Sequence, residues 1–515
     1  MQPVYSVAAM RKSDAAAIVA GIPARELMRR AGEGIFSAYP WKGPVAVVCG
    51  PGNNGGDGFV LALCFARAGI LCRILLLSDS FSEDGAFYFA KCREAGIPVE
   101  TEIAKPDFSG DCEIADCLFG TGFHGGLTET AKQWIEAINQ SGKPVISADL
   151  NSGLHGDSGM GEPAVKSTLT VSVGFPKAGH YLGRAKDLIG RLINLDIGIP
   201  LSESPYRLCE AGDFATVLRF RPQCSQKGDY GYVGILGGCE AYAGAVKLAN
   251  LSCAALRAGC GVAALMVPES LAPAVAPYLL ESTLETIPDR NGAMLFDPGR
   301  LREITARRRA LAIGMGWGNA PANREILTWI LKEYPGFLVI DADAINCLSQ
   351  MDRGLLRRVS GRAILTPHPK EMERLCGIPV PELLEDPVAH AMEFAAQYGV
   401  TLLLKGPTTV VTDGKETYLV NRGCAGMATA GSGDVLSGVL AGMLGYSDAT
   451  PLTAACGAYL AGLAGELAEA EENPISMTSS DTIRMIPAAM SRMLEAQEHI
   501  SPERYDSGHN IYNIY

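Results

Sequence analysis

Short apolar runs alternate with longer amphipathic segments along the first 200 positions of the chain. Residues 45–49 (VAVVC) form such a run, which is followed by a glycine-rich turn, a helix-like segment at 59–68 and a second apolar run at 70–77. Apolar runs of this length, separated by helices, are typical of buried parallel strands. The same pattern predicts strands at 117–119, 144–148 and 169–174 and a helix at 129–139. The first part of the chain is therefore predicted to be an α/β domain.

The pattern is interrupted at 200–213, where serine, glutamate and proline replace the periodic apolar positions. We interpret this stretch as a linker and predict domains at 1–205 and 206–500, with a polar surface tail at 501–515. Beyond the linker, apolar runs again alternate with helix-length segments, which predicts a second, mostly parallel sheet. Its predicted strands lie at 232–236, 262–267, 310–314, 337–340, 363–365 and 401–404. Asp413-Gly414 between two β-rich runs predicts a hairpin around 410–415.

Composition and charge narrow the class of protein. The chain has 515 residues, too many for one hydrophobic core, which agrees with two domains. Its 44 basic and 56 acidic residues leave a net charge of −12, which argues against general binding to nucleic acids or anionic membranes. The 15 cysteines form no Cys-x-x-Cys pair, so we expect reduced thiols and a cytoplasmic protein. No secretory signal or transmembrane helix is predicted, and the apolar stretch at 449–465 is interpreted as a buried helix.

The first candidate site is the glycine-rich turn after the strand at 45–49. It contains Asn53, Asn54, Gly55, Gly56 and Asp57. Exposed N–H groups at the start of a helix, together with the helix dipole, favour a bound phosphate. The turn fits neither the dinucleotide fingerprint G-x-G-x-x-G nor the nucleoside triphosphatase motif G-x-x-x-x-G-K-[ST]. The alternative is a tight turn that binds nothing.

Two further segments place an aspartate beside glycines at a predicted strand end. These aspartates are Asp116 and Asp149, and Ser152 follows the second. Ligands of open α/β sheets bind at the carboxyl ends of the strands. Oxygen atoms of Asn54, Asp116 and Ser152 are suited to a hard cation, and Asp149 is suited to proton transfer. The alternative is that each aspartate only caps a helix or turn.

In their order and spacing, these three segments resemble the N-terminal domain of NAD(P)HX epimerases, over residues 4–199. Phe175, Pro176 and Lys177 match a later strand and turn of that family, whereas Asn151 replaces its commoner proline. The resemblance implies a Rossmann-like three-layer α/β sandwich, a hydrated nicotinamide dinucleotide as ligand, and Asp149 as a catalytic residue. It also implies K⁺ bound by Asn54, Asp116 and Ser152. The expected substrate contacts are Asn53, Asn54, Gly55, Gly56, Asp57, Gly120, Thr121, Gly122, Phe123, His124, Gly125, Gly126 and Asp149.

The second candidate site is the glycine-rich segment that ends at Asp434 and precedes a helix predicted at 435–444. Several free N–H groups converge there beside a carboxylate, an arrangement suited to phosphoryl transfer. The N–H groups would stabilise charge on the transferred phosphoryl group, and Asp434 would accept the proton of the attacking hydroxyl. The alternative is that Asp434 is only a helix cap.

Four other loops at predicted strand ends accompany this segment. They are the glycine-rich stretches 237–245 and 314–318, His368 between two prolines, and the loop that begins at Lys405. In this order the five motifs resemble the ribokinase-like superfamily, and more narrowly its NAD(P)HX dehydratase domain, over residues 206–495. The resemblance implies a ribokinase-like three-layer α/β domain with Asp434 as a catalytic residue. The expected substrate contacts are Ala245, Gly318, His368 and Asp434, and the expected nucleotide contacts are Lys405, Gly406, Pro407, Thr408, Thr409 and Gly433.

Together the two resemblances imply one chain that repairs the hydrated cofactors NADHX and NADPHX. The N-terminal domain would interconvert the R and S epimers. The C-terminal domain would phosphorylate the hydroxyl of the S epimer and eliminate phosphate, which restores NAD(P)H. We expect Mg²⁺ with the adenine nucleotide. We favour ADP over ATP, because the order epimerase then dehydratase is typical of bacterial, ADP-dependent members, and we expect a homo-oligomer.

Two alternatives stay open on the sequence alone. An ATP-dependent small-molecule kinase of the ribokinase superfamily would use Asp434 on a different substrate hydroxyl. A non-enzymatic scaffold would act through the N-terminal domain, although scaffolds tend to lose the acidic residues that this chain keeps. The departures from the dehydratase pattern bear on nucleotide contacts rather than on the fold, and they are Cys239, Lys370 and Glu466.

Overall fold

The chain forms two compact units. The computed structural model describes residues 1–200, 204–218, 220–251 and 257–498. The N-terminal unit spans Pro3–Arg207 with Leu384–Asp386, and the C-terminal unit contains Leu208–Leu383 and the chain from Pro387 onward, with Met1–Gln2. The tail predicted at 501–515 lies outside the described residues.

The predicted linker at 200–213 is not structureless. Positions 201–203 lie outside the described residues, but the rest includes strand β9 (Tyr206–Leu208) and a 3-10 turn (Ala211–Phe214). The turn is capped by its own carboxylates, because the backbone N–H of Glu210 donates to Asp213. Short polar segments can therefore be ordered by local capping without any apolar periodicity.

The N-terminal unit is built on a seven-stranded sheet in which every adjacent pair is parallel. The strand order is β4-β3-β2-β5-β6-β7-β8. The sheet therefore grows in opposite directions from the β2–β5 pair, which is the switch point where open sheets bind ligands. The strands are β2 (Val45–Cys49), β3 (Cys72–Leu76), β4 (Val99–Glu100), β5 (Glu113–Cys117), β6 (Val145–Ala148), β7 (Leu169–Val173) and β8 (Leu192–Leu195).

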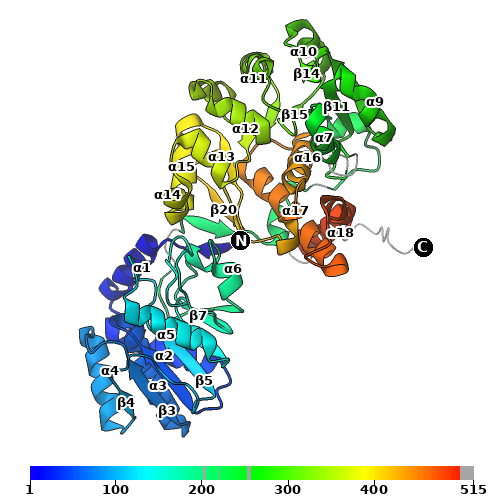
Figure 1. Cartoon of the computed structure of the whole chain (residues 1–515). Helices are drawn as coiled ribbons and strands as arrows, with labels where there is room; N and C mark the ends of the chain where they lie inside the picture. Colours follow the sequence, from blue (N-terminus) through cyan, green and yellow to red (C-terminus); the bar gives the residue numbers. More distant parts are fainter. Residues whose placement is uncertain (201–203, 219, 252–256, 499–515) are drawn as a thin grey trace. The chain divides into compact units, whose positions relative to one another are not determined.

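Helices cover both faces of this sheet (Figure 1). Alternate residues of a strand point to opposite faces, so Val45 and Val47 pack in the cluster with α3 and α4, whereas Ala46 and Val48 pack with α5. The predicted α/β class and three-layer sandwich are confirmed. The helices are α1 (Val7–Val19), α2 (Ala24–Ala38), α3 (Asn53–Ala68), α4 (Glu83–Glu94), α5 (Glu129–Gln140) and α6 (Ala185–Leu188).

The glycine-rich segment after β2 is helical where the pattern predicted a turn. Helix α3 begins at Asn53, because Gly52 adopts a φ of 89° and turns the chain directly into the helix. The helical glycines allow close packing on β2: a Cβ on Gly55 would lie 2.2 Å from the Gly50 carbonyl oxygen, and one on Gly58 would lie 2.7 Å from Cys49 Sγ. The helix N-terminus is thereby held at the end of the strand.

The C-terminal unit also contains a largely parallel sheet, with the order β20-β19-β18-β17-β16-β15-β10-β11-β12. Between β20 and β12, the β18–β19 and β19–β20 pairs are antiparallel and the other adjacent pairs are parallel. The hairpin predicted around 410–415 is therefore confirmed. The strands are β10 (Tyr232–Leu236), β11 (Val262–Pro268), β12 (Thr283–Ile287), β15 (Ala310–Ile313), β16 (Phe337–Ile340), β17 (Ala363–Leu365), β18 (Thr401–Leu404), β19 (Thr409–Thr412) and β20 (Thr417–Val420).

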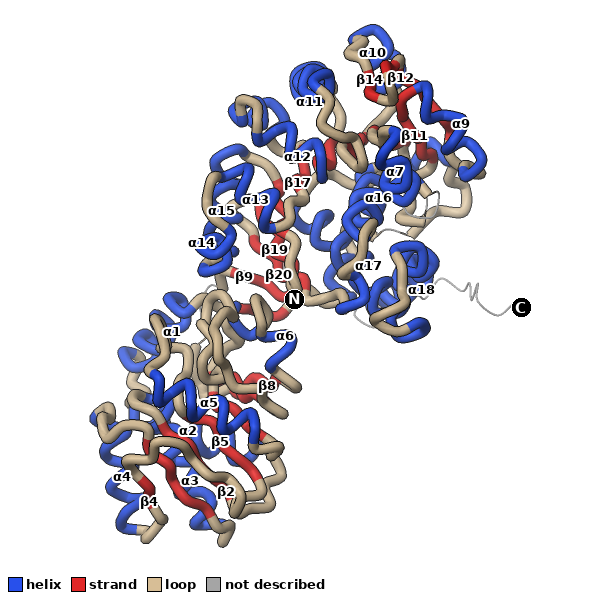
Figure 2. The backbone as a smooth tube through the Cα atoms, viewed as in Figure 1, coloured by secondary structure: helices blue, strands red, loops and turns tan. Residues whose placement is uncertain are grey.

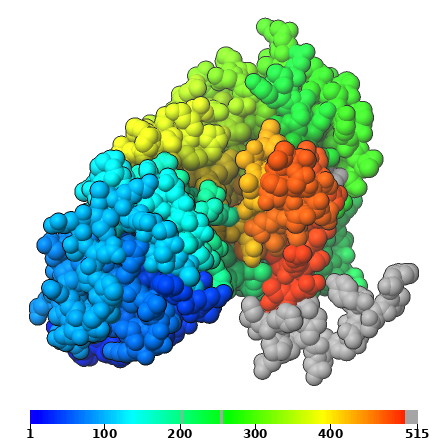
Figure 3. Space-filling model, turned by 60° about the horizontal axis from the view of Figure 1, so that its bottom comes forward, coloured from blue at the N-terminus to red at the C-terminus, as the bar shows by residue number. Residues whose placement is uncertain are grey.

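Two layers of helices enclose this second sheet (Figure 2). Val233 and Ile235 of β10 share a buried cluster with α7, α16, α17 and α18, and α18 forms part of the outer surface of the unit (Figure 3). Helices α11, α12, α13 and α15 lie on the other side (Figure 1). The helices are α7 (Ala243–Asn250), α9 (Ala272–Val275), α10 (Pro298–Thr305), α11 (Pro321–Glu333), α12 (Ala342–Ser349), α13 (Pro369–Cys376), α14 (Val380–Glu385), α15 (Pro387–Tyr398), α16 (Ser432–Leu444), α17 (Pro451–Glu472) and α18 (Ser479–Glu498).

Three short strands complete the description: β1 (Gln2–Val4) and the pair β13 (Asp289–Arg290) and β14 (Ala293–Met294). The stretch at 449–465 belongs largely to α17 and is mostly buried, as predicted. In the described part of the chain, no helix combines the length and the apolar character that crossing a membrane requires.

Gly50 provides a test of the close approach at the N-terminal switch point. A Cβ at this position would lie 1.9 Å from the carbonyl oxygen of Leu118, so the two strand ends would have to separate. We expect Gly50→Ala to lower the free energy of unfolding by about 1–3 kcal/mol. Calorimetry of the full chain measures this. The control Gly110→Ala meets no atom within 4 Å, so an equal loss in both variants would refute the explanation.

Candidate active sites

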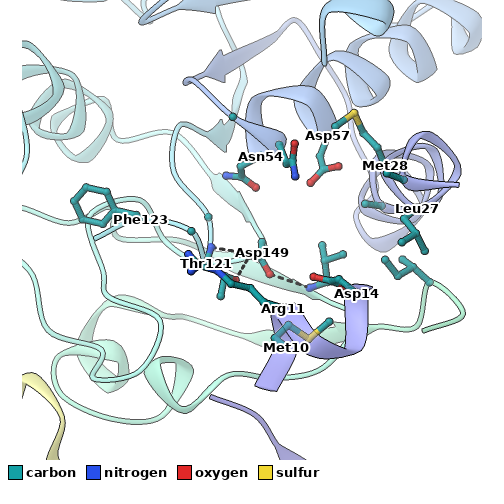
Figure 4. Close-up of a pocket in the computed structure, with 18 of the residues that line it drawn as sticks. Met10, Arg11, Asp14, Leu27, Met28, Asn54, Asp57, Thr121, Phe123 and Asp149 are labelled. Atoms are coloured by element: carbon teal, nitrogen blue, oxygen red, sulfur yellow. Dashed lines mark hydrogen bonds between the residues drawn. The ribbon is translucent and has the colours of Figure 1, made fainter. Parts of the chain in front are cut away.

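The N-terminal unit contains a cavity of about 540 Å³ at the switch point of its sheet (Figure 4). Its walls come from α1, α2 and the start of α3, from the loop after β5, and from the ends of β6 and β7. The lining residues used below are Met10, Arg11, Asp14, Met28, Asn53, Asn54, Asp57, Gly120, Thr121, Gly122, Phe123, His124, Asp149, Val173 and Lys177.

Asn54 is the least satisfied polar group of this cavity. Its side chain is buried, with 6% of the residue exposed, and among the described residues neither its amide nitrogen nor its amide oxygen has a hydrogen-bond partner. Gly120 leaves the space beside it open, because a Cβ there would lie 3.2 Å from Asn54 Oδ1 and 3.0 Å from Asp149 Oδ2. Buried polar groups in folded proteins are nearly always paired, so Asn54 indicates a missing ligand.

Asp149 is held by a buried ion pair. Its Oδ1 accepts a hydrogen bond from Lys177 Nζ at 2.5 Å, and its Oδ2 accepts hydrogen bonds from the backbone N–H of Thr121 at 2.9 Å and from the Thr121 hydroxyl. Burial alone would raise the pKa of Asp149, but the Lys177 charge and these hydrogen bonds outweigh it and lower the pKa to about 2. The carboxylate therefore remains ionised.

The backbone of Asp149 is also fixed. Its φ is 62°, a left-handed conformation that is uncommon for a residue other than glycine. His180 Nδ1 accepts from the Lys177 backbone N–H at 2.9 Å, so Nε2 carries the hydrogen and donates to the Asp149 carbonyl oxygen at 2.6 Å. Burial and the nearby Lys177 charge lower the pKa of His180 to about 4, which keeps the ring neutral. These contacts hold the strained residue in place.

Two other carboxylates face the same cavity without such partners. Burial raises the pKa of Asp57 well above its usual range, and the charge of Asp149 raises it further. Burial likewise raises the pKa of Asp14 to about 6, with Lys177 opposing and Asp149 adding to the shift. The cavity thus combines one permanently ionised carboxylate with two that bind protons readily.

Asp116 lies behind the cavity rather than among its lining residues. It is fully buried and accepts hydrogen bonds from the Ser147 hydroxyl (2.8 Å), the Ser152 hydroxyl (2.5 Å), the Ser152 backbone N–H (3.0 Å) and the Leu118 backbone N–H (3.3 Å). Burial raises its pKa. No basic side chain in the described part of the chain forms an ion pair with it. A buried carboxylate that lacks a positive partner suits a bound cation.

In the C-terminal unit, Asp434 lies in the first turn of α16. Gly431, with a φ of 98°, starts the helix, and no side chain caps its free N–H groups. Burial raises the pKa of Asp434 to about 7, with Asp341 adding to the shift and Lys405 opposing it. A carboxylate with this pKa beside uncapped N–H groups suits a general base next to a bound phosphate.

A buried ion pair also anchors this second site. Lys405 Nζ lies 3.0 Å from Asp341 Oδ1 and 3.8 Å from Glu371 Oε2, and Asp341 Oδ2 accepts from the Ser437 hydroxyl at 2.8 Å. A Cβ on Gly433 would lie 3.5 Å from Lys405 Nζ. Burial alone would raise the pKa of Asp341, but Lys405 lowers it. Lys405 is therefore fixed beside the start of α16.

His368 begins α13 as its N-cap. Its Nδ1 accepts from the backbone N–H groups of Lys370 (3.1 Å) and Glu371 (3.3 Å), and Glu371 accepts from the His368 N–H in return. The neutral ring then carries its hydrogen on Nε2, which can donate to a ligand. Burial lowers the pKa of His368, which favours the neutral ring.

The loops that carry Ala245 and Gly318 meet at the C-terminal switch point between β10 and β15. A Cβ on Gly316 would lie 2.9 Å from the Ala245 Cβ, and one on Gly318 would lie 3.3 Å from Cys239 Sγ. The Gly318 N–H donates to Asp343 Oδ2 at 2.7 Å. Gly318 and Asp343 also line a hollow of about 270 Å³.

Comparisons with known proteins agree with this division of the chain. One family model, described as NAD(P)H-hydrate dehydratase, matches residues 233–488, and another, described as YjeF-related protein N-terminus, matches residues 24–179. The bifunctional NAD(P)H-hydrate repair enzyme of Moorella thermoacetica is 33% identical, over 93% of this chain and 94% of the relative. This chain belongs to the bifunctional NAD(P)H-hydrate repair enzymes.

Two further known proteins, one curated relative and one solved structure, are similar to this chain. The bifunctional NAD(P)H-hydrate repair enzyme of Escherichia coli is 31% identical, over 96% of this chain and 93% of its own length. The crystal structure of the ADP/ATP-dependent NAD(P)H-hydrate dehydratase of Bacillus subtilis, co-crystallised with ATP and Mg²⁺, is 27% identical with a TM-score of 0.44. The matched region covers 54% of this chain and 94% of the Bacillus subtilis chain.

In this NAD(P)H-hydrate repair enzyme, the N-terminal cavity gathers most of the residues predicted to contact substrate. Asn53, Asn54, Asp57, Asp149 and the loop from Gly120 to His124 line it. Gly55 and Gly56 instead lie inside α3 and allow packing, because a Cβ on Gly56 would lie 2.5 Å from Met28 Cε. Gly125 and Gly126 are not among the lining residues.

Sequence reasoning missed Asp14 and Arg11 of α1 as lining residues, and Lys177 as the partner of Asp149. Lys177 lies four residues beyond the end of β7, and nothing in the local pattern marks it as the partner of Asp149. In the C-terminal unit it missed Asp341, which follows β16 directly. Of the predicted nucleotide loop, Thr408 donates its hydroxyl hydrogen to Asn421 Oδ1 at 3.0 Å.

Lys177→Met tests the ion pair that holds Asp149. Removal of the lysine leaves a buried unpaired carboxylate, and we expect a loss of about 3–5 kcal/mol in the free energy of unfolding near pH 8. Without Lys177, burial raises the pKa of Asp149 in the folded variant above its value in the unfolded chain. As the pH falls, the folded variant therefore binds a proton at Asp149 before the unfolded chain does. The gap between variant and wild type should therefore shrink as the pH falls to 5.

Urea titrations at pH 5 and pH 8 measure this gap. Lys166→Met, at an exposed position of the same unit, should change the free energy of unfolding by less than about 0.5 kcal/mol. A Lys177→Met variant as stable as Lys166→Met would contradict the structural role of the pair.

Proposed function

We propose that this chain restores hydrated nicotinamide cofactors in two reactions. The N-terminal unit interconverts the R and S epimers of NADHX and NADPHX, and the C-terminal unit converts the S epimer to NAD(P)H with ADP as the phosphoryl donor. The observation that carries this proposal is the similarity over 93% of the chain to a relative named for hydrate repair, across both units. One polypeptide would then act on both epimers.

The chemistry of the substrate explains the epimerase site. The hydroxyl at C6 of the hydrated ring is attached next to the ring nitrogen, whose lone pair can expel it once the oxygen is protonated. The ring becomes cationic when the C6–O bond breaks, and the fixed negative charge of Asp149 stabilises that cation. Asn54 and the loop from Gly120 to His124 would hold the dinucleotide in the cavity, with the α3 N-terminus available to its phosphates.

The residues proposed for K⁺ fit a monovalent cation. Within the described part of the chain, Asn54 Oδ1 lacks a hydrogen-bond partner, and Asp116 is a buried carboxylate without a positive neighbour in direct contact. Ser152 would complete the oxygen set, since its hydroxyl and N–H are both directed to Asp116. K⁺ would supply positive charge that keeps Asp116 ionised and orders the loops around the substrate.

The dehydratase reaction requires a better leaving group than hydroxide. Asp434 would take the proton from the C6 hydroxyl as its oxygen attacks the terminal phosphorus of ADP, which releases AMP. The C6–O bond then breaks with loss of a proton from C5, so phosphate leaves and the C5–C6 double bond of NAD(P)H forms. Uncapped N–H groups at Gly433 and the fixed Lys405 would stabilise the phosphate charge, with Mg²⁺ bound to the nucleotide.

The remaining substrate contacts would come from Ala245, Gly318 and His368, and the remaining nucleotide contacts from Gly406 to Thr409. We also propose a cytoplasmic location, which the reduced state of every described cysteine supports. The homo-oligomer stays a prediction, which light scattering of the purified protein tests.

Single substitutions should separate the two activities. Mixed R and S NADHX with ADP and Mg²⁺ should recover full NADH absorbance in the wild type, because epimerisation feeds the R form to the dehydratase. Asp434→Asn should lower the dehydration rate by about 10²–10⁴-fold, the usual contribution of a general base, while epimer exchange continues. Asp149→Asn should slow epimer exchange only. Chromatography of the epimers and absorbance at 340 nm follow the two rates.

Failure of the wild type to recover NADH would reject the proposed function. Turnover of a sugar or vitamin alcohol with ATP would instead support the kinase alternative. Dehydration by Asp434→Asn at the wild-type rate would remove this residue from the mechanism.

The dehydration rate should depend on the protonation of Asp434. The unprotonated carboxylate is the active form, and its pKa is about 7, so kcat/KM should be level above pH 7 and fall as the pH decreases below it. Asp341 raises the pKa of Asp434, so Asp341→Asn should move the midpoint to lower pH. A midpoint near pH 4 in the wild type would contradict this assignment.

A further inference from the structure

Helix α1 contributes a carboxylate to the epimerase cavity that none of the predicted motifs contains. Asp14 lines the cavity, and Figure 4 shows it rising from α1 into the space where Asn54, Asp57 and Asp149 also point. In the part of the chain that the structure describes, the Asp14 carboxylate forms no hydrogen bond or ion pair. Its position leaves it available to a ligand.

Three of the four carboxylates that line the cavity, Asp14, Asp57 and Asp149, differ in the contacts that hold them. Asp149 is fixed by Lys177 and Thr121, and its proton affinity is low. Neither Asp57 nor Asp14 has such a partner, and burial raises the pKa of each. Asp149 is therefore suited to stabilise positive charge but not to exchange protons, whereas the raised pKa values of the other two make them suited to bind and release a proton.

The charged groups around Asp14 come from every wall of the cavity. Lys177 follows β7, Asp149 follows β6, Asp57 lies on α3, and Arg11 precedes Asp14 on α1 itself. Asp84 of α4 also lines the cavity but is paired with Arg25 at 2.9 Å. Lys177 already neutralises Asp149, so Asp14 and Asp57 are the two lining carboxylates without a basic partner in direct contact.

Epimerisation needs proton transfer on two faces of one ring carbon. On the first face, an acid protonates the C6 hydroxyl, the C6–O bond breaks, and water leaves as the ring nitrogen forms a double bond to C6. On the second face, water adds to C6 and gives a proton to a base. The acid has lost one proton and the base has gained one, so the reverse reaction restores both. Two carboxyl groups on different walls meet this requirement.

We propose that Asp14 is a catalytic residue of the epimerase site, which transfers a proton on one face of the hydrated ring while Asp57 transfers a proton on the other. Asp14 comes from α1 and Asp57 from α3, so the ring can lie between them (Figure 4). The fixed charge of Asp149 then stabilises the cationic ring that exists between the two transfers. This inference rests on the proposed epimerase function of the N-terminal unit.

Asp14→Asn in the full chain tests the proposal. Epimer exchange is followed by chromatography of R and S NADHX without ADP, with the uncatalysed exchange subtracted. We expect kcat to fall by about 100-fold or more, as for loss of a general acid or base, while KM changes by less than about 3-fold, because the amide keeps the shape of the side chain. Asp14→Glu, which keeps the carboxyl group, should restore at least a tenth of the wild-type kcat.

Two controls separate chemistry from folding. Lys12→Gln, at an exposed position of the same helix, should leave epimer exchange unchanged. ADP-dependent dehydration of the S epimer shows that the C-terminal unit of each variant is folded. The melting temperature of Asp14→Asn should match that of the wild type, which shows that the N-terminal unit is folded too.

The outcomes are distinct. Asp14→Asn with a kcat above one third of the wild-type value would overturn the inference and leave the epimerase function intact. A loss in Asp14→Asn that Asp14→Glu does not reverse would also overturn it, since a structural role would then suffice. A wild type that does not exchange the epimers would reject the epimerase function itself, and the inference with it.

Discussion

The close approach of two strand ends at Gly50 and Leu118 is the constraint on which the N-terminal site depends. The Gly50 N–H donates to the Cys117 carbonyl oxygen at 3.1 Å, and the chains then diverge into α3 and into the loop that carries Gly120. Because α3 also packs on Gly50 through Gly55, its first turn is brought to the edge of the sheet. Asn54 and Asp57 reach the cavity for this reason, and Asp116 is buried beneath it.

The C-terminal unit uses the same geometry for a different reaction. The Gly238 N–H donates to the Met315 carbonyl oxygen at 2.9 Å, which brings together the loops after β10 and β15. A Cβ on Gly314 would lie 2.0 Å from the Asp341 carbonyl oxygen. The chain after β16 therefore lies equally close to the loop after β15. Glycine at each crossing lets backbones approach where side chains would keep them apart.

Much of the fold follows from local pattern, and the exceptions have physical reasons. Strands such as Tyr232–Leu236 and Phe337–Ile340 are largely apolar runs bounded by glycine or aspartate, and they were predicted with their observed bounds. The strand predicted at 117–119 was wrong, because β5 spans Glu113–Cys117 and carries two buried carboxylates. Backbone N–H groups of Lys42 and Gly43 satisfy Glu113, at 2.9 Å each, and this tertiary contact leaves no mark in the pattern.

The candidate sites show the same limit. The glycine-rich motifs could be placed from sequence because glycine and aspartate mark strand ends. Asp14 could not be assigned to the site from sequence, because α1 is rich in alanine and its apolar and polar positions do not separate into clear buried and exposed faces. The partner of Asp149 lies at position 177 and that of Lys405 at position 341, and such distant pairs depend on the strand order, which sequence spacing does not reveal.

Both sites contain the same two kinds of acidic group, an ion-paired aspartate and a carboxyl group with a raised pKa. Each contains a buried lysine–aspartate pair, Lys177 with Asp149 and Lys405 with Asp341, whose charges are fixed by direct contact. Each also contains a carboxyl group with a raised pKa and no ion pair of its own, Asp14 in one and Asp434 in the other. A negative charge nearby favours the protonated form of its neighbour, so the aspartate of each pair contributes to the raised pKa of the free carboxyl group. In the proposed mechanisms, the groups that stabilise charge and the groups that move protons are therefore separate residues in each unit, and the first set raises the pKa of the second.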